Sequence, residues 1–294
     1  VMSPVKPIHP PIRTNPAIDI DKLKLRLVPV ERRIDFDVTP SGAALADGTA
    51  LSGPNPYETW GARFTALGAA TGGQVLTFAC DIRDAEAVER MVEAADGAAP
   101  LTALVNNAAG NFLARSEELS PRAVDAVVGI VLKGSLNATL ALGRRWLAQG
   151  RQGTVLSIVT SYAWTGSAYV LPSAVAKAGV LAMTRSLAVE WGGRGLRLNA
   201  IAPGPFPTAG AWERLVPRPE LAAAFETRNP QRRPGRHREL ADLAVYLLAD
   251  GSAYINGEVV AIDGGEWLEG AGQFSFLKGM LDDADWEALR PPRR

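Results

Sequence analysis

The sequence from about residue 72 onward alternates short apolar runs rich in Val, Ile and Leu with longer segments that carry an apolar stripe at helical spacing. This alternation is typical of β-α-β units, in which a helix returns the chain to the next parallel strand. The expected strands are apolar on both faces, as required when helices cover both sides of a sheet. They span residues 74–82, 101–110, 153–161, 196–204 and 258–265. The expected helices span residues 84–96, 120–150, 173–193 and 237–250. The pattern predicts an α/β fold built on a doubly wound parallel sheet.

Composition narrows the function classes. With 294 residues, 47% of them apolar, the chain is long enough to bury a large core. Its 31 Lys and Arg balance its 31 Asp and Glu, so net charge points neither to nucleic acid nor to an anionic membrane. Cys80 is the single cysteine, which excludes an internal disulfide and favours core packing, and His9 and His237 are too isolated to form a metal site. The longest apolar runs are shorter than the roughly 20 residues that span a bilayer, and we expect a cytoplasmic protein.

The first 60 residues differ in pattern from the rest. Prolines at 4, 7, 10, 11 and 16 predict an extended opening arm. Residues 21–39 then alternate charged and apolar side chains, which is typical of half-exposed strands, and Pro29 interrupts them. We therefore expect an atypical N-terminal segment over residues 1–60 and the main domain over residues 61–294.

Several motifs follow one another at informative intervals. "NNAAG" at 106–110 ends an expected strand, where small residues let the backbone approach a flat ligand. It is followed by "SIVTSYAWTG" at 157–166, "PSAVAKAG" at 172–179, "LRLNAIAPGPFPT" at 196–208 and "INGEVVAIDGG" at 255–265. On these motifs the sequence resembles the short-chain dehydrogenase/reductase family over residues 72–265. The resemblance implies a Rossmann-like fold and an NAD(P)-dependent oxidoreductase.

One departure from the common family pattern narrows the resemblance. Most short-chain enzymes place Tyr four residues before the catalytic Lys, Ser on the preceding loop and Asn in the helix before that. Here those positions hold Ser173, Thr160 and Val131. The 2,4-dienoyl-CoA reductases instead place their Tyr where Tyr162 stands, fifteen residues before Lys177. The segments 106–112, 119–134, 162–179, 202–215 and 264–277 are similar to that branch.

The resemblance implies specific roles around the expected active site. Tyr162 would donate a hydrogen bond to the thioester oxygen, with Asn111 and Ser173 as supporting donors. Lys177, one helical turn beyond Ser173, would bind the nicotinamide ribose and lower the pKa of a nearby phenol. For Ser173, a helix N-cap after Pro172 is a competing interpretation. Tyr169 has no motif role, and we interpret it as packing over the site.

The resemblance also implies ligand contacts. Cofactor contacts are expected at Asp81, Asn107, Lys177, Pro203, Gly204, Pro205 and Phe206. Acyl-CoA contacts are expected at Arg83, Phe112, Ser120 and Arg214. The arginine-rich run 213–238 is expected to be a solvated, mobile flap, in which one or two arginines pair with CoA phosphates. The implied cofactor is NADP(H), with NAD(H) as an alternative, and the implied assembly is a homotetramer.

The N-terminal glycine-rich motif of the family is not matched. In "VTPSGAALADG", which begins at Val38, Thr39 fits, but Pro40, Ala44 and Ala46 stand where glycines would let backbone amides approach the pyrophosphate. Three explanations compete: a working enzyme with an unusual phosphate loop, a reductase core kept as a scaffold or acyl-CoA binder, and an upstream reading-frame shift or wrong start. We expect that the chain passes hydride from NADPH to a 2,4-dienoyl-CoA. The alternatives are a carbonyl or alcohol oxidoreductase that uses Ser173 and Thr160, and a non-catalytic binding protein.

Overall fold

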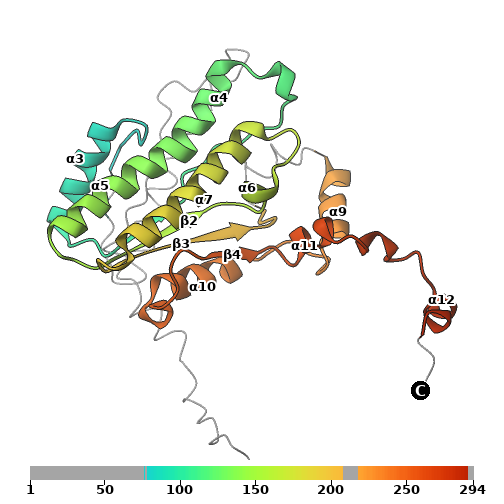
Figure 1. Ribbon diagram of the computed structural model, residues 1–294. Coiled ribbons are helices and arrows are strands. Elements are labelled where there is room, and N and C mark those ends of the chain that lie inside the picture. Colours follow the sequence, from blue (N-terminus) through green and yellow to red (C-terminus); the bar gives the residue numbers. More distant parts are fainter. Residues whose placement is uncertain (1–75, 77, 208–217, 291–294) are drawn as a thin grey trace, which may run out of the picture.

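Four parallel strands form the sheet in the order β1-β2-β3-β4 within the part of the chain that the structure describes. The structure is a computed structural model that describes residues 76, 78–207 and 218–290 (Figure 1). The strands are β1 Ala103–Asn106, β2 Gly153–Ile158, β3 Leu196–Pro203 and β4 Val259–Ile262. The main helices are α3 Ala85–Ala98, α4 Pro121–Val128, α5 Gly134–Ala148, α7 Leu171–Gly192 and α10 His237–Leu248. The shorter elements are η2 Ser116–Glu118, η3 Gly129–Lys133, α6 Tyr162–Thr165, α9 Pro219–Arg228, η4 Asp250–Ser252, α11 Glu266–Ala271, η5 Ser275–Leu277 and α12 Asp283–Ala288.

Helices cover both faces of this sheet. Figure 1 shows α3, α5 and α7 on one face and α10 on the other. The alternation along β3 has the same two-sided pattern, because successive strand residues point to opposite faces. Leu198 and Ala200 pack in the clusters under α5 and α7, whereas Ile201 packs with Leu247 of α10. The predicted doubly wound α/β fold is therefore confirmed.

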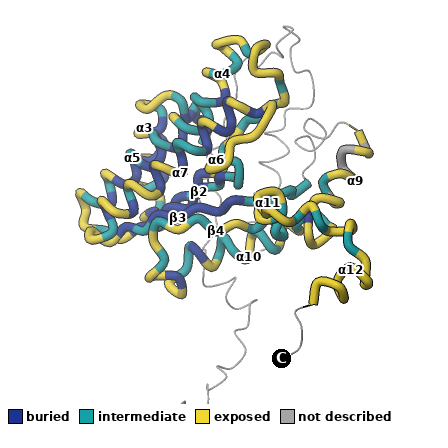
Figure 2. Tube along the Cα trace, turned by 45° about the vertical axis from the view of Figure 1, so that its right-hand side comes forward, coloured by how far each residue is buried: buried dark blue, intermediate teal, exposed yellow. Residues whose placement is uncertain are grey.

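Close backbone approaches set the helices against the sheet. A Cβ at Gly153 of β2 would lie 2.4 Å from the ring of Trp146, so only glycine lets this indole reach the strand. Trp146 is fully buried and donates from Nε1 to the carbonyl of Leu101 at 2.7 Å. Figure 2 shows the buried residues concentrated in the strands and in the helix faces above them.

The helical run Pro121–Ala148 passes through α4, the π-helical turn η3 and α5. Among the described residues this run alone is long and apolar enough to cross a membrane. Half of its most apolar window is buried inside the protein. It packs against α3, α7 and the sheet, as a core helix does.

One expected strand, at 74–82, is not found among the described residues of that run. Phe78 to Asp81 belong to no strand, while Cys80 and Ile82 are buried in the core, as expected for Cys80. A strand needs a hydrogen-bonded neighbour, and within the described residues β1 pairs only with β2. The N-terminal segment 1–60 lies outside the described residues.

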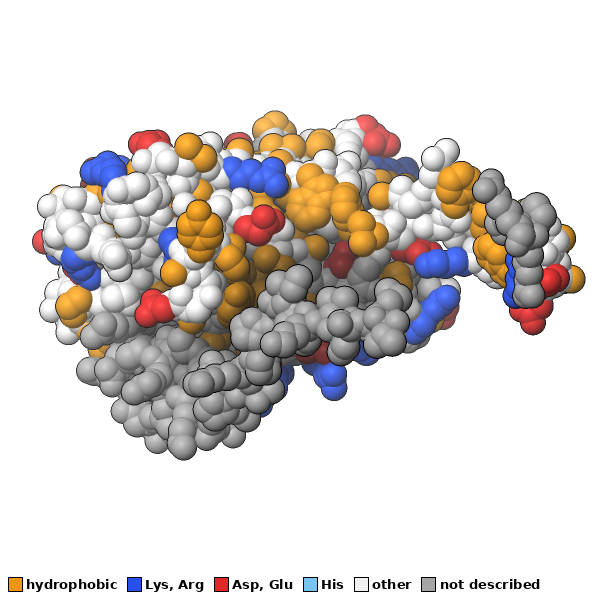
Figure 3. Space-filling model, turned by 60° about the horizontal axis from the view of Figure 1, so that its bottom comes forward, with side chains coloured by type: hydrophobic (Ala, Val, Ile, Leu, Met, Phe, Trp, Pro, Cys, Tyr) orange, Lys and Arg blue, Asp and Glu red, His pale blue; other side chains and the backbone are white. Residues whose placement is uncertain are grey.

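The chain ends in a C-terminal arm, which we define as residues 266–290. Figures 1 and 2 show it leading away from the sheet toward α12. Figure 3 shows apolar side chains along it. Its exposed large apolar residues are Leu268, Phe274, Phe276, Met280, Trp286 and Leu289.

Candidate active site

The phenol of Tyr162 is held by two predicted site residues from different elements. Tyr162 begins α6, the single helical turn that follows β2. Its Oη lies 3.1 Å from Ser173 Oγ and accepts from Asn111 Nδ2 at 3.3 Å. Asn111 Oδ1 accepts from the backbone N–H of Phe112 at 2.9 Å, which turns the amide N–H₂ group toward the phenol. The structure thus brings together three residues that lie up to 62 positions apart in the sequence.

The structure decides between the two interpretations of Ser173. Helix α7 begins at Leu171, with Val170 as its N-cap and Pro172 in its first turn, where the missing proline N–H costs nothing. Ser173 therefore lies inside the helix, is 2% exposed and directs its hydroxyl at Tyr162. The N-cap interpretation is wrong.

Lys177 lies one turn further along α7 and is buried. Its Nζ donates to the carbonyl of Ile158, the last residue of β2, and no other partner of Nζ is found among the described residues. Burial lowers the pKa of Lys177 to about 8. An ammonium has three N–H donors, so donors remain for a ligand such as a ribose diol. This unfilled donor capacity, in a buried group at the strand ends, fits a nicotinamide nucleotide.

Of the three positions of the common family arrangement, the one that holds Asn in most members carries no polar side chain here. Val131 is fully buried within η3, where its carbonyl accepts from Ser135 Oγ at 2.7 Å. Thr160 is half-buried after β2. The π-helical turn, a feature that often marks functional sites, was not predicted. Here it carries a side chain that cannot hydrogen-bond.

The expected nicotinamide-facing loop is rigidly placed. Pro203 ends β3, and Gly204 N donates to the carbonyl of Ile262 at 3.0 Å. A Cβ on Gly204 would lie 2.8 Å from Asp263 Cα, so this close approach requires glycine. Pro205 O accepts from Gly235 N at 2.9 Å. The loop is therefore fixed against the segment that follows β4.

Phe206 and Asn107 complete the expected cofactor contacts. A Cβ on Gly235 would lie 2.3 Å from the ring of Phe206, which places this ring directly on the glycine. Asn107 is exposed just after β1, whereas its neighbour Asn106 is buried.

Asn106 Nδ2 donates to Thr139 Oγ1 at 2.9 Å and to Ser157 Oγ at 3.2 Å. This buried cluster ties β1, α5 and β2 together, and sequence reasoning missed it.

Two residues expected to bind different ligands bind each other. Arg83 donates from Nε to Asp81 Oδ1 at 2.9 Å and from Nη2 to Oδ2 at 2.6 Å. The hydrogen bond from Arg83 holds the pKa of Asp81 below its usual value. Asn137 Nδ2 donates to the carbonyl of Ile82 at 2.8 Å and so fixes this segment to α5. The stem of Arg83 passes over Gly129, whose Cβ would lie 3.2 Å from Arg83 Cδ.

The remaining expected substrate contacts are less closely grouped. Phe112 packs against the core cluster that contains Val127. Ser120 is the N-cap of α4, and its Oγ accepts from the backbone N–H of Ala123 at 3.2 Å. Arg214 lies outside the described residues.

The described part of the arginine-rich run contains a helix and local ion pairs. Its middle forms helix α9, Pro219–Arg228. Arg233 and Arg236 both pair with Glu239 of α10, at 2.8 and 3.0 Å, and Arg238 lies 3.6 Å from Asp242. These three arginines already have carboxylate partners, while the expected mobility of the run stays a prediction.

The packing interpretation of Tyr169 is also wrong. Its side chain is 61% exposed, and its backbone adopts the left-handed conformation, with φ of 68°. Its carbonyl accepts from Ala114 N at 3.0 Å, which joins the loop after α6 to the segment that carries Asn111. The strain is therefore located beside the Tyr162 site, where such conformations often serve a purpose.

A cavity of about 370 Å³ lies at the carboxyl end of β4. It is lined by Pro205, Phe206, Asn229, Gln231, Arg233, Gly235, Glu239 and residues 261–265. Only Pro205 and Phe206 of these were predicted site residues. Two residues of the expected nicotinamide-facing loop thus line the cavity, whereas Tyr162 does not. In the described part of the chain, no group of His, Cys, Asp and Glu could hold a metal ion.

Comparison with known proteins places this geometry in a family. Residues 54–266 match a family model described as enoyl-(acyl carrier protein) reductase. A Bacillus subtilis protein named as a probable 2,4-dienoyl-CoA reductase, (2E)-enoyl-CoA-producing, is 45% identical over 67% of this chain and 78% of its own length. A Caenorhabditis elegans protein named as a probable 2,4-dienoyl-CoA reductase 3, (3E)-enoyl-CoA-producing, is 42% identical over 67% of this chain and 65% of its own. The crystal structure of a short chain dehydrogenase from Bacillus anthracis is 41% identical, with a TM-score of 0.60 over 66% of this chain and 76% of that one.

A Rossmann-type sheet with a buried lysine and a phenol at its strand ends defines a nicotinamide-dependent oxidoreductase. The chain belongs to the short-chain dehydrogenase/reductase family. The expected similarity to its 2,4-dienoyl-CoA reductase branch is confirmed by the named relatives.

Proposed function

We propose that this protein reduces 2,4-dienoyl-CoA to enoyl-CoA with NADPH, in the breakdown of unsaturated fatty acids. The observation that carries the proposal is the Tyr162 phenol, held between Asn111 and Ser173, in a chain with no tyrosine four residues before Lys177. The substrate class also follows the names of the relatives from Bacillus subtilis and Caenorhabditis elegans.

The chain's own residues stabilise charge on the substrate. A bound nicotinamide would supply the hydride, which would add to the far end of the diene. The electrons move toward the thioester oxygen, where Tyr162 Oη and Asn111 Nδ2 can donate hydrogen bonds to the developing dienolate. Ser173 accepts from or donates to the phenol and so orients it. Uptake of one proton by the carbon chain completes the balance.

Lys177 orients the cofactor in this proposal. Its bond to the Ile158 carbonyl fixes the side chain, and its remaining N–H donors would bind the ribose hydroxyls. The exposed Asn107 and the loop from Pro203 to Phe206 would bound the nicotinamide. Asp81 would accept from the adenine, and Arg83, Phe112, Ser120 and Arg214 would contact the acyl-CoA. We propose NADP(H) rather than NAD(H), a homotetramer and a cytoplasmic location, each following from the family resemblance.

Two measurements test the proposal. Titration of NADPH fluorescence with the purified chain should show binding, and 2,4-hexadienoyl-CoA should accelerate NADPH oxidation while a panel of ketones should not. Tyr162→Phe, which keeps the ring and removes the hydroxyl, is the matched control and should retain cofactor binding. If NADPH does not bind at about millimolar concentration, its binding free energy is weaker than about −4 kcal/mol. That result would contradict the proposed function. Turnover of ketones alone would instead favour a carbonyl reductase.

A further inference from the structure

The indole of Trp267 carries a buried N–H group that has no partner. Trp267 lies on α11, and its Nε1 is the only buried side-chain nitrogen or oxygen without a hydrogen bond in the described part of the chain. Leaving such a donor unpaired costs about 1–3 kcal/mol. Native structures rarely keep this cost unless the group serves another purpose, such as binding a ligand acceptor.

The indole is fixed in position by the fold. The backbone N–H of Trp267 donates to Asp263 Oδ2 at 2.9 Å, and Asp263 Oδ1 accepts from Gly265 N at 2.9 Å. The ring meets that of Trp164 edge to face, with centroids 5.5 Å apart and an interplanar angle of 82°. A donor held in this way loses little conformational entropy when it binds an acceptor.

One member of the aromatic pair, Trp164, lies close to Tyr162 along the chain. Trp164 is two residues after Tyr162 in the single turn of α6. Trp164 is 37% exposed, and an edge-to-face contact joins its ring to that of Trp267. A ligand that approaches the buried N–H from the Tyr162 side would have to displace this ring.

The surroundings select a neutral acceptor. Glu266 and Asp263 both precede Trp267 in the sequence. Burial raises the pKa of the Glu266 carboxyl, the charge of Arg228 opposes this rise in part, and the charge of Asp263 adds to it. A second anion would be repelled in such a poorly solvated place. A carbonyl oxygen of an amide accepts an indole N–H without bringing charge.

We propose that Trp267 is a ligand-binding residue whose indole N–H donates to an amide carbonyl in the pantetheine arm of the acyl-CoA. This inference rests on the proposed function, since it assigns the next carbonyl beyond the thioester that Tyr162 and Asn111 contact. Trp164 forms the movable aromatic wall between the two donors. None of these roles for the tryptophans was expected from the sequence.

The test removes the N–H and keeps the ring. Trp267 is replaced by 3-benzothienylalanine, in which sulfur stands for the indole N–H, and the same replacement at Trp286, 55% exposed on α12, is the matched control. Calorimetry measures binding of two saturated probes that cannot be reduced: the hexanoyl thioester of N-acetylcysteamine, which has the amide, and that of butanethiol, which lacks it. The wild-type chain should prefer the first by about two- to tenfold, the worth of one hydrogen bond.

The replacement at Trp267 should bring this preference to about one, and the control should leave it unchanged. An unchanged preference in the Trp267 variant, or none in the wild-type chain, overturns the proposal. If the Trp267 variant has a lower Tm but keeps the preference for the amide probe, the indole N–H stabilises the fold by donating to the face of the Trp164 ring and does not bind the ligand. Because the probes need no turnover, failure to reduce dienoyl-CoA while the preference depends on Trp267 would contradict the proposed reaction but not the binding role.

Discussion

The guanidinium of Arg83 donates hydrogen bonds from Nε and Nη2 to the carboxylate of Asp81, and the backbone N–H of Arg83 donates to the same carboxylate at 3.0 Å. The sequence resemblance assigns Asp81 to the cofactor and Arg83 to the acyl-CoA. The two predicted ligand sites therefore share one ion pair. Both side chains are more than a third exposed, so the pair itself contributes at most about 1 kcal/mol to stability.

The shared pair predicts that changes at either residue affect both ligands. Asp81→Asn should weaken NADPH binding directly and weaken CoA binding indirectly, because the arginine loses its bidentate partner. Arg83→Lys should likewise affect both affinities, by about threefold to tenfold each. Calorimetric titration of NADPH and of CoA against the single and double variants measures this coupling. Strictly additive effects, with each residue affecting one ligand only, would contradict it.

Tyr162 and Tyr169 give a matched pair of phenols from the same loop region. Tyr162→Phe should lower kcat/KM for 2,4-hexadienoyl-CoA by about 10²–10⁴-fold, because the oxygen that receives charge loses its donor. Tyr169→Phe should leave most turnover, since the Tyr169 hydroxyl has no partner among the described residues and the ring is exposed. Steady-state NADPH oxidation measures both. The opposite ranking would overturn the assignment of the catalytic phenol.

The buried Lys177 predicts an unusual dependence of stability on pH. Its pKa of about 8 is lower than the 10.5 of an ordinary lysine, so between these values the unfolded chain holds a proton that the folded chain lacks. The free energy of unfolding therefore rises with pH in this range, and the burial cost is fully present below pH 8. Lys177→Met should raise the free energy of unfolding at pH 7 by about 3 kcal/mol and lose this advantage toward pH 10.

Chemical denaturation at pH 7 and pH 10 measures that change. Lys133→Met, at an exposed lysine, is the control and should show little difference at either pH. Turnover by the wild-type chain should also fall above about pH 8, as the ammonium loses its charge. A Lys177→Met variant that is less stable than the wild type at pH 7 would show that the charged side chain is not paying a burial cost.

Most of the fold could be predicted from local patterns in the sequence. The four strands after residue 100 could be predicted because strands that are buried on both faces read as runs of apolar residues. The helices between them could be predicted from apolar stripes at helical spacing. The described residues of the run expected as a strand at 74–82 form none. A strand depends on a hydrogen-bonded neighbour, and the sequence of one run does not show which segment lies beside it. Short elements such as α6 and α11 have too few residues to show a period.

The site was accessible from the sequence only in part. The family resemblance implied roles for Tyr162, Ser173 and Asn111. Their contact depends on a one-turn helix that no sequence pattern predicts. In the sequence, Asp81 and Arg83 are two opposite charges two residues apart. The resemblance implies a different ligand for each, so their ion pair was not predicted. The unpaired N–H of Trp267 depends on what surrounds the ring, which only packing shows.

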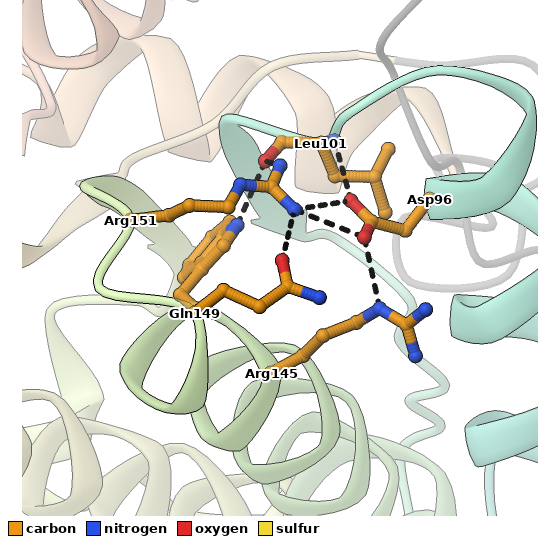
Figure 4. Close-up of polar contacts among 6 residues, drawn as sticks. Asp96, Leu101, Arg145, Gln149 and Arg151 are labelled. Atoms are coloured by element: carbon orange, nitrogen blue, oxygen red, sulfur yellow. Dashed lines mark hydrogen bonds and ion pairs between the residues drawn. The ribbon is translucent and has the colours of Figure 1, made fainter.

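Asp96 is the centre of an ion-pair network (Figure 4). The network lies at the opposite end of the sheet from Tyr162, because its residues precede β1 and β2 whereas Tyr162 follows β2. Its side chain is 6% exposed and accepts from Arg145 Nε at 2.8 Å, from Arg151 Nη1 at 2.9 Å and from Leu101 N at 2.8 Å. These bonds join the end of α3 to the end of α5 and to the chain entering β1. Removing the charge leaves two arginines without their carboxylate, which is costly in a buried place.

Asp96→Asn should therefore lower the free energy of unfolding by about 2–4 kcal/mol, somewhat less than for a fully buried pair because both arginines reach solvent. The control is Glu89→Gln, which breaks the exposed pair with Arg144 between the same two helices and should cost less than about 1 kcal/mol. Denaturant titration with circular dichroism measures both. Turnover per folded molecule should be unchanged in each variant, since the network lies at the amino ends of the strands. An Asp96→Asn variant as stable as Glu89→Gln would show that the network adds nothing beyond a surface pair.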